Sequence, residues 1–139
     1  MEGDIHIWGN AILPALDLPA LVYVQSDFQF YYSFAGPNPE LARIHAPNLS
    51  YIGCSLDIEG APALVDLDLT SLYHVQQYLS IVDNDLLGSL DGLAGLHSVY
   101  QSVNIQDNAC LSPQEASAFA ESIDAGGANV WGNTGPCPN

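Results

Sequence analysis

The stretch Tyr78-Leu79-Ser80-Ile81-Val82-Asp83-Asn84 decides the fold, together with its near copy Ser102-Val103-Asn104-Ile105-Gln106-Asp107-Asn108. In both, apolar residues stand at the second and fourth positions, a polar residue separates them, and an asparagine ends the segment. Alternation with a period of two is typical of a strand that buries one face. The two segments therefore predict equivalent strands that lie one repeat apart.

Four more segments carry the same pattern, at 4–10, 27–33, 55–61 and 128–133. The second apolar position of the six copies is taken by Ile7, Phe30, Ile58, Ile81, Ile105 and Val130. Successive positions are 23 to 28 residues apart, within the ~20–29-residue period of leucine-rich repeats. One such turn cannot bury its inner face, whereas stacked turns bury a continuous core. The spacing predicts a single mainly β domain over residues 1–139, a right-handed parallel β-solenoid.

The corners between strands also repeat. Asparagines end the strands at matching places, with Ser33 and Ala61 as substitutes; they are Asn10, Asn84, Asn108 and Asn133. A side-chain amide at a corner bonds unpaired backbone groups, and stacked copies bond each other. We expect a structural role for these asparagines. The Gly/Pro-rich segment 34–39 falls in the longest step and is expected to leave the coil as a loop.

From Ser112 the pattern changes to that of a helix. Ser112-Pro113-Gln114-Glu115 is a capping box with proline at the first helical position. The pair Gly126-Gly127 is expected to end this helix, and a final strand should run over 128–132. Residues 1–108 are thus expected to form the repeat turns, and 109–139 a C-terminal helix–strand cap.

The chain has three cysteines, whose spacing fits no zinc motif. Cys110 precedes the predicted helix and Cys137 follows the final strand, so a disulfide between them would clamp the cap. Cys54 is expected as a buried small apolar residue at the start of a strand. An intermolecular crosslink through Cys54 is the alternative.

The repeated Leu-x-Ile followed by Asn, with Leu-x-x-Leu-x-x-Val between copies, resembles the receptor L-domain-like leucine-rich repeats. These occur in insulin- and growth-factor-type receptor ectodomains and in many bacterial surface proteins, and the bacterial secreted or surface type is the more similar. The resemblance covers essentially the whole chain. It implies an exported protein, secreted or held at the cell surface, that acts in recognition, adhesion or assembly.

The charge balance excludes some partners. Arg43 is the only strong base, lysine is absent, and sixteen carboxylates give a formal net charge of −15. Nucleic acid is therefore not expected as a partner, because nothing neutralises its phosphates. Anionic membrane surfaces are disfavoured for the same reason. No run approaches ~18 consecutive apolar residues, so membrane insertion is not expected either.

No catalytic constellation can be assembled from the sequence, so we expect the protein not to be an enzyme. His74 and His97 occupy near-equivalent places in successive repeats; solvated surface histidines are the preferred interpretation, and a shared metal ion is the alternative. Asp83-Asn84-Asp85 resembles the start of a calcium loop but lacks its glycine and distal glutamate. We assign no cofactor and no metal ligand, and leave weak calcium binding by stacked carboxylates open.

The outward positions of the predicted strands form columns across the sheet. One column is His6, Gln29, Asp57, Ser80, Asn104 and Asn129, and the next is Trp8, Tyr31, Glu59, Val82, Gln106 and Trp131. Large aromatic residues at both ends of a column suit a binding surface. The candidate binding residues are Trp8, Gln29, Tyr31, Asp57, Glu59 and Trp131. A second strip contains Tyr23, Tyr51, Tyr73, His74 and His97, but tyrosine is also a good strand residue.

Two functions follow from this reading. The first is a recognition or adhesion module that binds a protein or glycan on a sheet face. The second is a structural subunit that stacks end to end into dimers or filaments through an uncapped N-terminal turn. Apolar residues of that turn, Ile5, Ile7, Ile12 and Leu16, would be exposed there.

Overall fold

The computed structural model describes residues 2–30 and 36–137. The elements in these ranges are β1 (Ile5–His6), β2 (Ala15–Asp17), β3 (Tyr23–Val24), β4 (Phe28–Phe30), β5 (Arg43–His45), β6 (Tyr51–Ile52), β7 (Leu56–Glu59), β8 (Asp66–Asp68), β9 (His74–Val75), β10 (Tyr78–Val82), a 3-10 helix (Asp91–Leu93), β11 (Ser98–Gln106), α1 (Pro113–Ser122) and β12 (Asp124–Trp131). The predicted mainly β class is confirmed.

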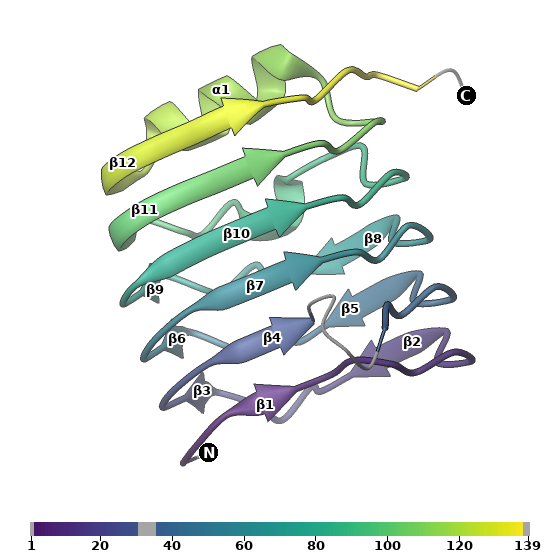
Figure 1. The fold of residues 1–139 in the computed structure, drawn as a ribbon. Coiled ribbons are helices and arrows are strands. Elements are labelled where there is room, and N and C mark those ends of the chain that lie inside the picture. Colours follow the sequence, from purple (N-terminus) through teal and green to yellow (C-terminus); the bar gives the residue numbers. More distant parts are fainter. Residues whose placement is uncertain (1, 31–35, 138–139) are drawn as a thin grey trace.

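Parallel pairing joins neighbouring strands that come from successive repeats. The larger sheet runs β1-β4-β7-β10-β11, and β12 lies beside β11 at its end. The beginning of β11 also pairs with β9, which links β9, β6 and β3 to the same sheet. Strands β2, β5 and β8 form a separate sheet. Figure 1 shows this sheet behind the first, with the repeats stacked as layers from the N-terminus to β12.

The register of the strands reproduces the repeat read from the sequence. Ile58 pairs with Phe30 on one side and with Ile81 on the other. The series continues from Ile81 to Ile105, and from Ile105 to Val130. Each apolar anchor therefore lies directly above its equivalent in the previous layer, so one inward column extends through the sheet.

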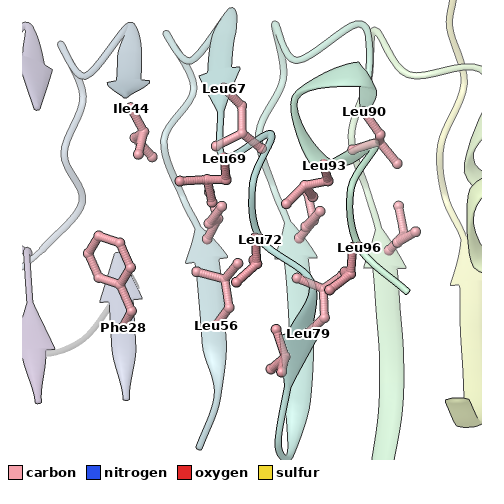
Figure 2. Close-up of a cluster of buried hydrophobic side chains, with 14 of the residues drawn as sticks. Phe28, Ile44, Leu56, Leu67, Leu69, Leu72, Leu79, Leu90, Leu93 and Leu96 are labelled. Carbon is pink, nitrogen blue, oxygen red and sulfur yellow. The ribbon is translucent and has the colours of Figure 1, made fainter. Parts of the chain in front are cut away.

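The core lies between the sheets and is almost entirely aliphatic. Figure 2 shows Leu56 and Leu79 from the large sheet facing Leu69, Leu72 and Leu96 from the segments opposite. These side chains are buried, as are the two phenylalanines of β4. Burying one such side chain is worth about 1.5–3 kcal/mol, so the stacked layers supply the stability that a single layer lacks.

A column of buried asparagines holds the corners together. The backbone N–H groups of Asn84 and Asn108 donate to the Oδ1 atoms of Asn108 and Asn133, at 3.1 and 3.2 Å. Each Nδ2 in turn donates to a strand carbonyl of the previous layer, as from Asn108 to Ile81 O at 2.9 Å. The predicted structural role is confirmed for these residues.

Ser33, the predicted substitute in the second layer, lies outside the described residues. Asn38 belongs to the column: it is buried, accepts from Asn10 N at 3.1 Å, and donates to Ile7 O at 2.8 Å. Gly36, two residues before it, has a positive φ of 89°, like the corner residues Gly9 and Gly60. The prediction that all of 34–39 leaves the layer was therefore wrong at its end, because 36–38 already form the next corner.

The C-terminal cap follows the prediction at its start and departs from it at its end. Ser112 Oγ accepts from Glu115 N at 3.1 Å, with proline at the first helical position. The carboxylate of Glu115, however, accepts from Leu90 N at 3.0 Å, so it fastens the helix to the layer below rather than completing a capping box. None of the helices in the described residues is long and apolar enough to cross a membrane.

The prediction that Gly126-Gly127 ends the helix was wrong. Helix α1 already stops at Ser122, and the N–H of Asp124 donates to His97 O at 3.0 Å. Strand pairing with β11 thus begins at Asp124, four residues earlier than predicted, and the two glycines lie inside β12. A Cβ atom at Gly126 would overlap the carbonyl oxygen of Gln101, which explains that glycine by close backbone approach.

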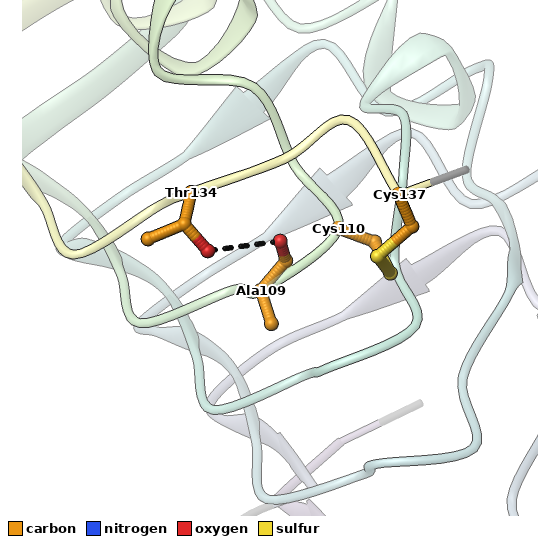
Figure 3. Close-up of a disulfide and its surroundings, with 4 residues drawn as sticks. All are labelled: Ala109, Cys110, Thr134 and Cys137. Atoms are coloured by element: carbon orange, nitrogen blue, oxygen red, sulfur yellow. Dashed lines mark hydrogen bonds between the residues drawn. A yellow bond between two sulfur atoms is a disulfide. The ribbon is translucent and has the colours of Figure 1, made fainter.

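The disulfide between Cys110 and Cys137 is present, and it ties the tail to the corner before α1 (Figure 3). The tail is also held by Thr134 Oγ1, which donates to Ala109 O at 3.1 Å. Cys54 is free and partly exposed, so the prediction that it is buried was wrong. It lies at the corner before β7, where its Sγ accepts from Ser26 Oγ at 3.7 Å.

Candidate binding surface

The outward side chains of β1, β4, β7, β10, β11 and β12 form one continuous surface, here called the outer face. Its first row is His6, Gln29, Asp57, Ser80, Asn104 and Asn129, each in register with the next. These residues alternate with buried anchors such as Phe28 and Leu56. The period-two alternation therefore turns one set of side chains into the core and the other outward.

The second row of the outer face contains Glu59, Val82, Gln106 and Trp131 in register. Trp131 is 56% exposed. Trp8 follows β1, is partly buried, and stacks on His6 with ring centroids 4.6 Å apart. Tyr31, the remaining predicted binding residue, lies outside the described residues. The structure thus brings Gln29, Asp57 and Glu59 together and places the two tryptophans in the first and last layers.

Two carboxylates, those of Asp57 and Glu59, lie on β7 in the middle of the outer face. Gln29 Nε2 donates to Asp57 Oδ2 at 2.8 Å. Burial raises the pKa of Asp57, while hydrogen bonds from Gln29 and Ser80 offset part of that rise. Burial also raises the pKa of Glu59, and the negative charges of Asp57 and Asp83 add to it. A shallow pocket of about 340 Å³ adjoins Glu59, lined also by Pro37, Gly60, Pro62 and Asp83.

The raised pKa of Glu59 leads to a prediction about pH. A carboxyl whose folded pKa exceeds its usual value near 4.5 favours folding below that value, and this contribution is lost as pH rises through the folded pKa. Glu59→Gln is therefore expected to raise the free energy of unfolding at pH 7 by up to about 1 kcal/mol. The gain should vanish near pH 3.5.

Urea unfolding of both proteins at the two pH values measures this effect. Glu40→Gln, which removes a charge from an exposed position, controls for the general relief of negative charge. A loss of stability in Glu59→Gln at pH 7, or a gain matched by Glu40→Gln, would contradict the prediction.

A second aromatic surface lies on the neighbouring strands. This Tyr–His strip comprises Tyr23, Tyr51, Tyr73, His74 and His97, of which Tyr23, Tyr51 and His74 are in register. Tyr51 stacks on His74 and Tyr73 on His97, with centroids 5.6 and 5.2 Å apart. A groove of about 410 Å³ adjoins the strip, lined by His74, Ser98, Val99, Tyr100, Asp124, Ala125 and Gly126.

The histidines of the strip are engaged separately. His74 Nδ1 lies 2.6 Å from Ser98 Oγ, and its Nε2 lies 2.9 Å from Gln76 Oε1, an oxygen that accepts a hydrogen bond from the ring. Each histidine stacks on a different tyrosine, and no group of three or more metal-ligating side chains occurs within 2–30 and 36–137. In the calcium-like segment Asp83-Asn84-Asp85, the side chain of Asn84 is buried in the asparagine column. Its amide is therefore held apart from the carboxylates of Asp83 and Asp85.

The one arginine of the chain lies on a different face, with His45 on the same strand. Arg43 on β5 lies 3.4 Å from the Asp66 carboxylate and 3.9 Å from that of Asp17. His45, two residues along the same strand, lies 2.9 Å from Asp68. Sequence reasoning missed these pairs, although a strand carrying Arg-x-His between two strands carrying aspartates was their signal. Because the chain has no other strong base, the outer face presents carboxylates without positive charge.

No family model, no curated protein and no solved structure matches the chain. The assignment of function therefore depends on the surfaces described above.

Proposed function

We propose that the chain is a right-handed parallel solenoid of receptor L-domain-like leucine-rich repeats. Parallel pairing at the repeat step, a continuous aliphatic core and the asparagine column support this interpretation. The disulfide between Cys110 and Cys137 supports export to an oxidising environment, at the cell surface or beyond it.

The function that we propose is non-catalytic recognition or adhesion, with a protein or glycan bound on the outer face. The observation that carries it is the regular row structure of this face. Its strands hold amide and carboxylate side chains at a fixed spacing, with Trp8 and Trp131 in its first and last layers. Interfaces of this kind take affinity from aromatic side chains and orientation from the polar groups around them.

The side chains of the outer face limit the class of partner that it can bind. Its carboxylates disfavour anionic ligands, and the paired Gln29 and Asp57 offer a fixed donor and acceptor array. Such an array suits hydroxyl-rich glycans or a protein surface with basic and amide side chains.

Binding of labelled protein to an array of polysaccharides and exported proteins tests this proposal. We expect Trp8→Ser and Gln106→Arg, which change the first and the next-to-last layer of the outer face, each to weaken binding at least about tenfold. Val65→Ser, at a residue that is 57% exposed and directly precedes β8 of the separate sheet, should leave binding unchanged. Absence of binding by the native protein, or equal loss in all three variants, would contradict the proposal.

A second candidate function is end-to-end assembly, and it is favoured by the first layer. Ile12 is 89% exposed there, and Ile5, Ile7 and Leu16 are only partly buried. Screening of the net charge by salt should strengthen such assembly. Light scattering should then show particles that grow with concentration and salt, and Ile12→Asp should reduce them. Unchanged scattering in Ile12→Asp would remove this candidate.

A further inference from the structure

The outer edge of β12 is the feature that carries a further inference. Among the described residues β12 pairs only with β11, so its other side ends the large sheet. Sheet edges are ordinarily protected by charged residues, prolines or bulges. The segment 127–131, Gly-Ala-Asn-Val-Trp, contains neither charge nor proline and pairs with β11 without a register shift.

The hydrogen bonds of β12 identify which backbone groups face this edge. The carbonyl of Trp131 accepts from Asp107 N at 3.1 Å, so the peptide groups of Trp131 point toward β11. Peptide groups alternate sides along a strand. The N–H and C=O groups of Ala128 and Val130 therefore point to the open edge.

Gly127 lacks an explanation within the chain. Its φ is not in the left-handed region, and a Cβ atom there would meet only Ser102 Cβ, at an ordinary 4.0 Å. Gly126, by contrast, is required by the carbonyl of Gln101. Glycine inside a strand is unfavourable and often marks close approach of another group. Gly127 thus leaves an open position on the outer face, next to the free edge.

We propose that β12 pairs in antiparallel fashion with β12 of a second copy of this chain, about a twofold axis at Asn129. Ala128 and Val130 of the two copies then form the hydrogen-bonded pairs on either side of the axis. Gly127 lies opposite Trp131 of the other copy on the outer face. The exposed indole covers the glycine, an arrangement that stabilises glycine-containing edge strands.

The inner face of β12 fits the same partner. Ala128 is exposed and Val130 partly exposed, although Val103 and Ile105, their equivalents in the preceding strand, are fully buried. A groove of about 220 Å³ lies beside them, lined also by Ser117, Ala120 and Glu121 of α1. In the dimer each Ala128 lies beside the other copy's Val130, so both gain the apolar cover that the single chain lacks.

Charge and chain path are compatible with this contact. Asp124 is the only charged residue of β12 and lies outside 127–131, and antiparallel pairing puts the two copies of it at opposite ends. The tail leaves the edge clear, because the disulfide and the bond from Gly135 N to Leu111 O at 3.0 Å hold it against 110–111. The dimer joins two outer faces edge to edge, but it does not depend on what the outer face binds.

A cysteine placed on the axis tests the geometry. Opposite residues of a non-hydrogen-bonded antiparallel pair lie about 4.5 Å apart, within disulfide range. In the Cys54→Ala background, Asn129→Cys is expected to form a covalent dimer on mild oxidation, whereas Asn104→Cys, one strand inward, is not. Non-reducing electrophoresis reads the result. Absence of the Asn129→Cys dimer, or equal crosslinking of Asn104→Cys, overturns the proposal.

Sedimentation velocity supplies the second measurement. The native protein should dimerise at micromolar to submillimolar concentration, more strongly at about 1 M than at about 0.15 M salt. Gly127→Thr keeps a strand-forming residue but fills the open position, and it should weaken dimerisation at least about tenfold with unchanged circular dichroism. Ile12→Asp, in the first layer, should not affect it. A native monomer throughout, or equal dimerisation by Gly127→Thr, would refute β12 pairing.

Discussion

Replacing Asn108 with alanine is expected to lower the free energy of unfolding by about 2–5 kcal/mol. Asn108 is completely buried, accepts from Asn84 N at 3.1 Å and donates to Ile81 O at 2.9 Å. Alanine takes away the side chain to which Asn84 N and Ile81 O are both hydrogen-bonded. Each buried polar group left unpaired costs about 1–3 kcal/mol. The loss should appear as a lower urea midpoint with an unchanged slope.

Asn104→Ala is the matched control for this experiment. Asn104 lies in β11, four residues before Asn108, but its side chain is on the outer face and accepts from Asn129 Nδ2 at 2.8 Å. Water replaces that bond when it is lost, so the change should stay within about 0.5 kcal/mol. If the two variants lose equal stability, the corner hydrogen bonds are not what holds the layers together.

Removing the disulfide is expected to cost about 3–4 kcal/mol. The bridge joins residues separated by 27 positions. In the chain-entropy model, closing a loop of that length lowers the conformational entropy of the unfolded chain, which stabilises the folded state by about 3–4 kcal/mol. The double variant Cys110→Ser and Cys137→Ser should therefore unfold at clearly lower urea concentration than the native protein.

Cys54→Ala separates this effect from the general loss of a thiol. Cys54 is free and partly exposed, so its removal should change stability by less than about 1 kcal/mol. Peptide mapping without reduction should recover Cys110 linked to Cys137. A bridge from Cys54 to either of them, or a native stability that is unchanged by a reducing agent, would contradict the prediction.

The repeat pattern was sufficient to predict β1, β4, β7, β10 and the later parts of β11 and β12, with their register, but not β3, β6 and β9 of the same sheet. The alternation around Leu79 and Ile81 recurs around Val103 and Ile105, and the structure pairs these residues directly. The reason is physical: a strand with one buried face cannot slip by one residue without turning its apolar side chains outward. The asparagine column followed for the same reason, because equal repeats place equal residues above one another.

The ends of elements and the contacts between faces depended on tertiary structure. Gly126-Gly127 is a helix-ending pair by local preference, yet pairing of Asp124 with β11 takes the chain into a strand first. Glu115 has a local partner at Ser112 but accepts instead from Leu90 N, in the layer below. In both cases a hydrogen bond to a backbone group of another layer forms in place of the structure that the local sequence favours.

What the sequence determined by itself is the repeat: which residues form the inward columns, where the corners fall outside the second layer, and which cysteines close the cap. What only the tertiary structure decided is which side chains from different repeats meet on the surface. Arg43 lies between Asp17 and Asp66, and Tyr51 stacks on His74, because parallel pairing aligns strands that are far apart in the chain. Periodicity constrains burial strongly, since misplacing an apolar column costs many buried side chains. It constrains outward contacts weakly, since exposed pairs contribute only about 0–1 kcal/mol each.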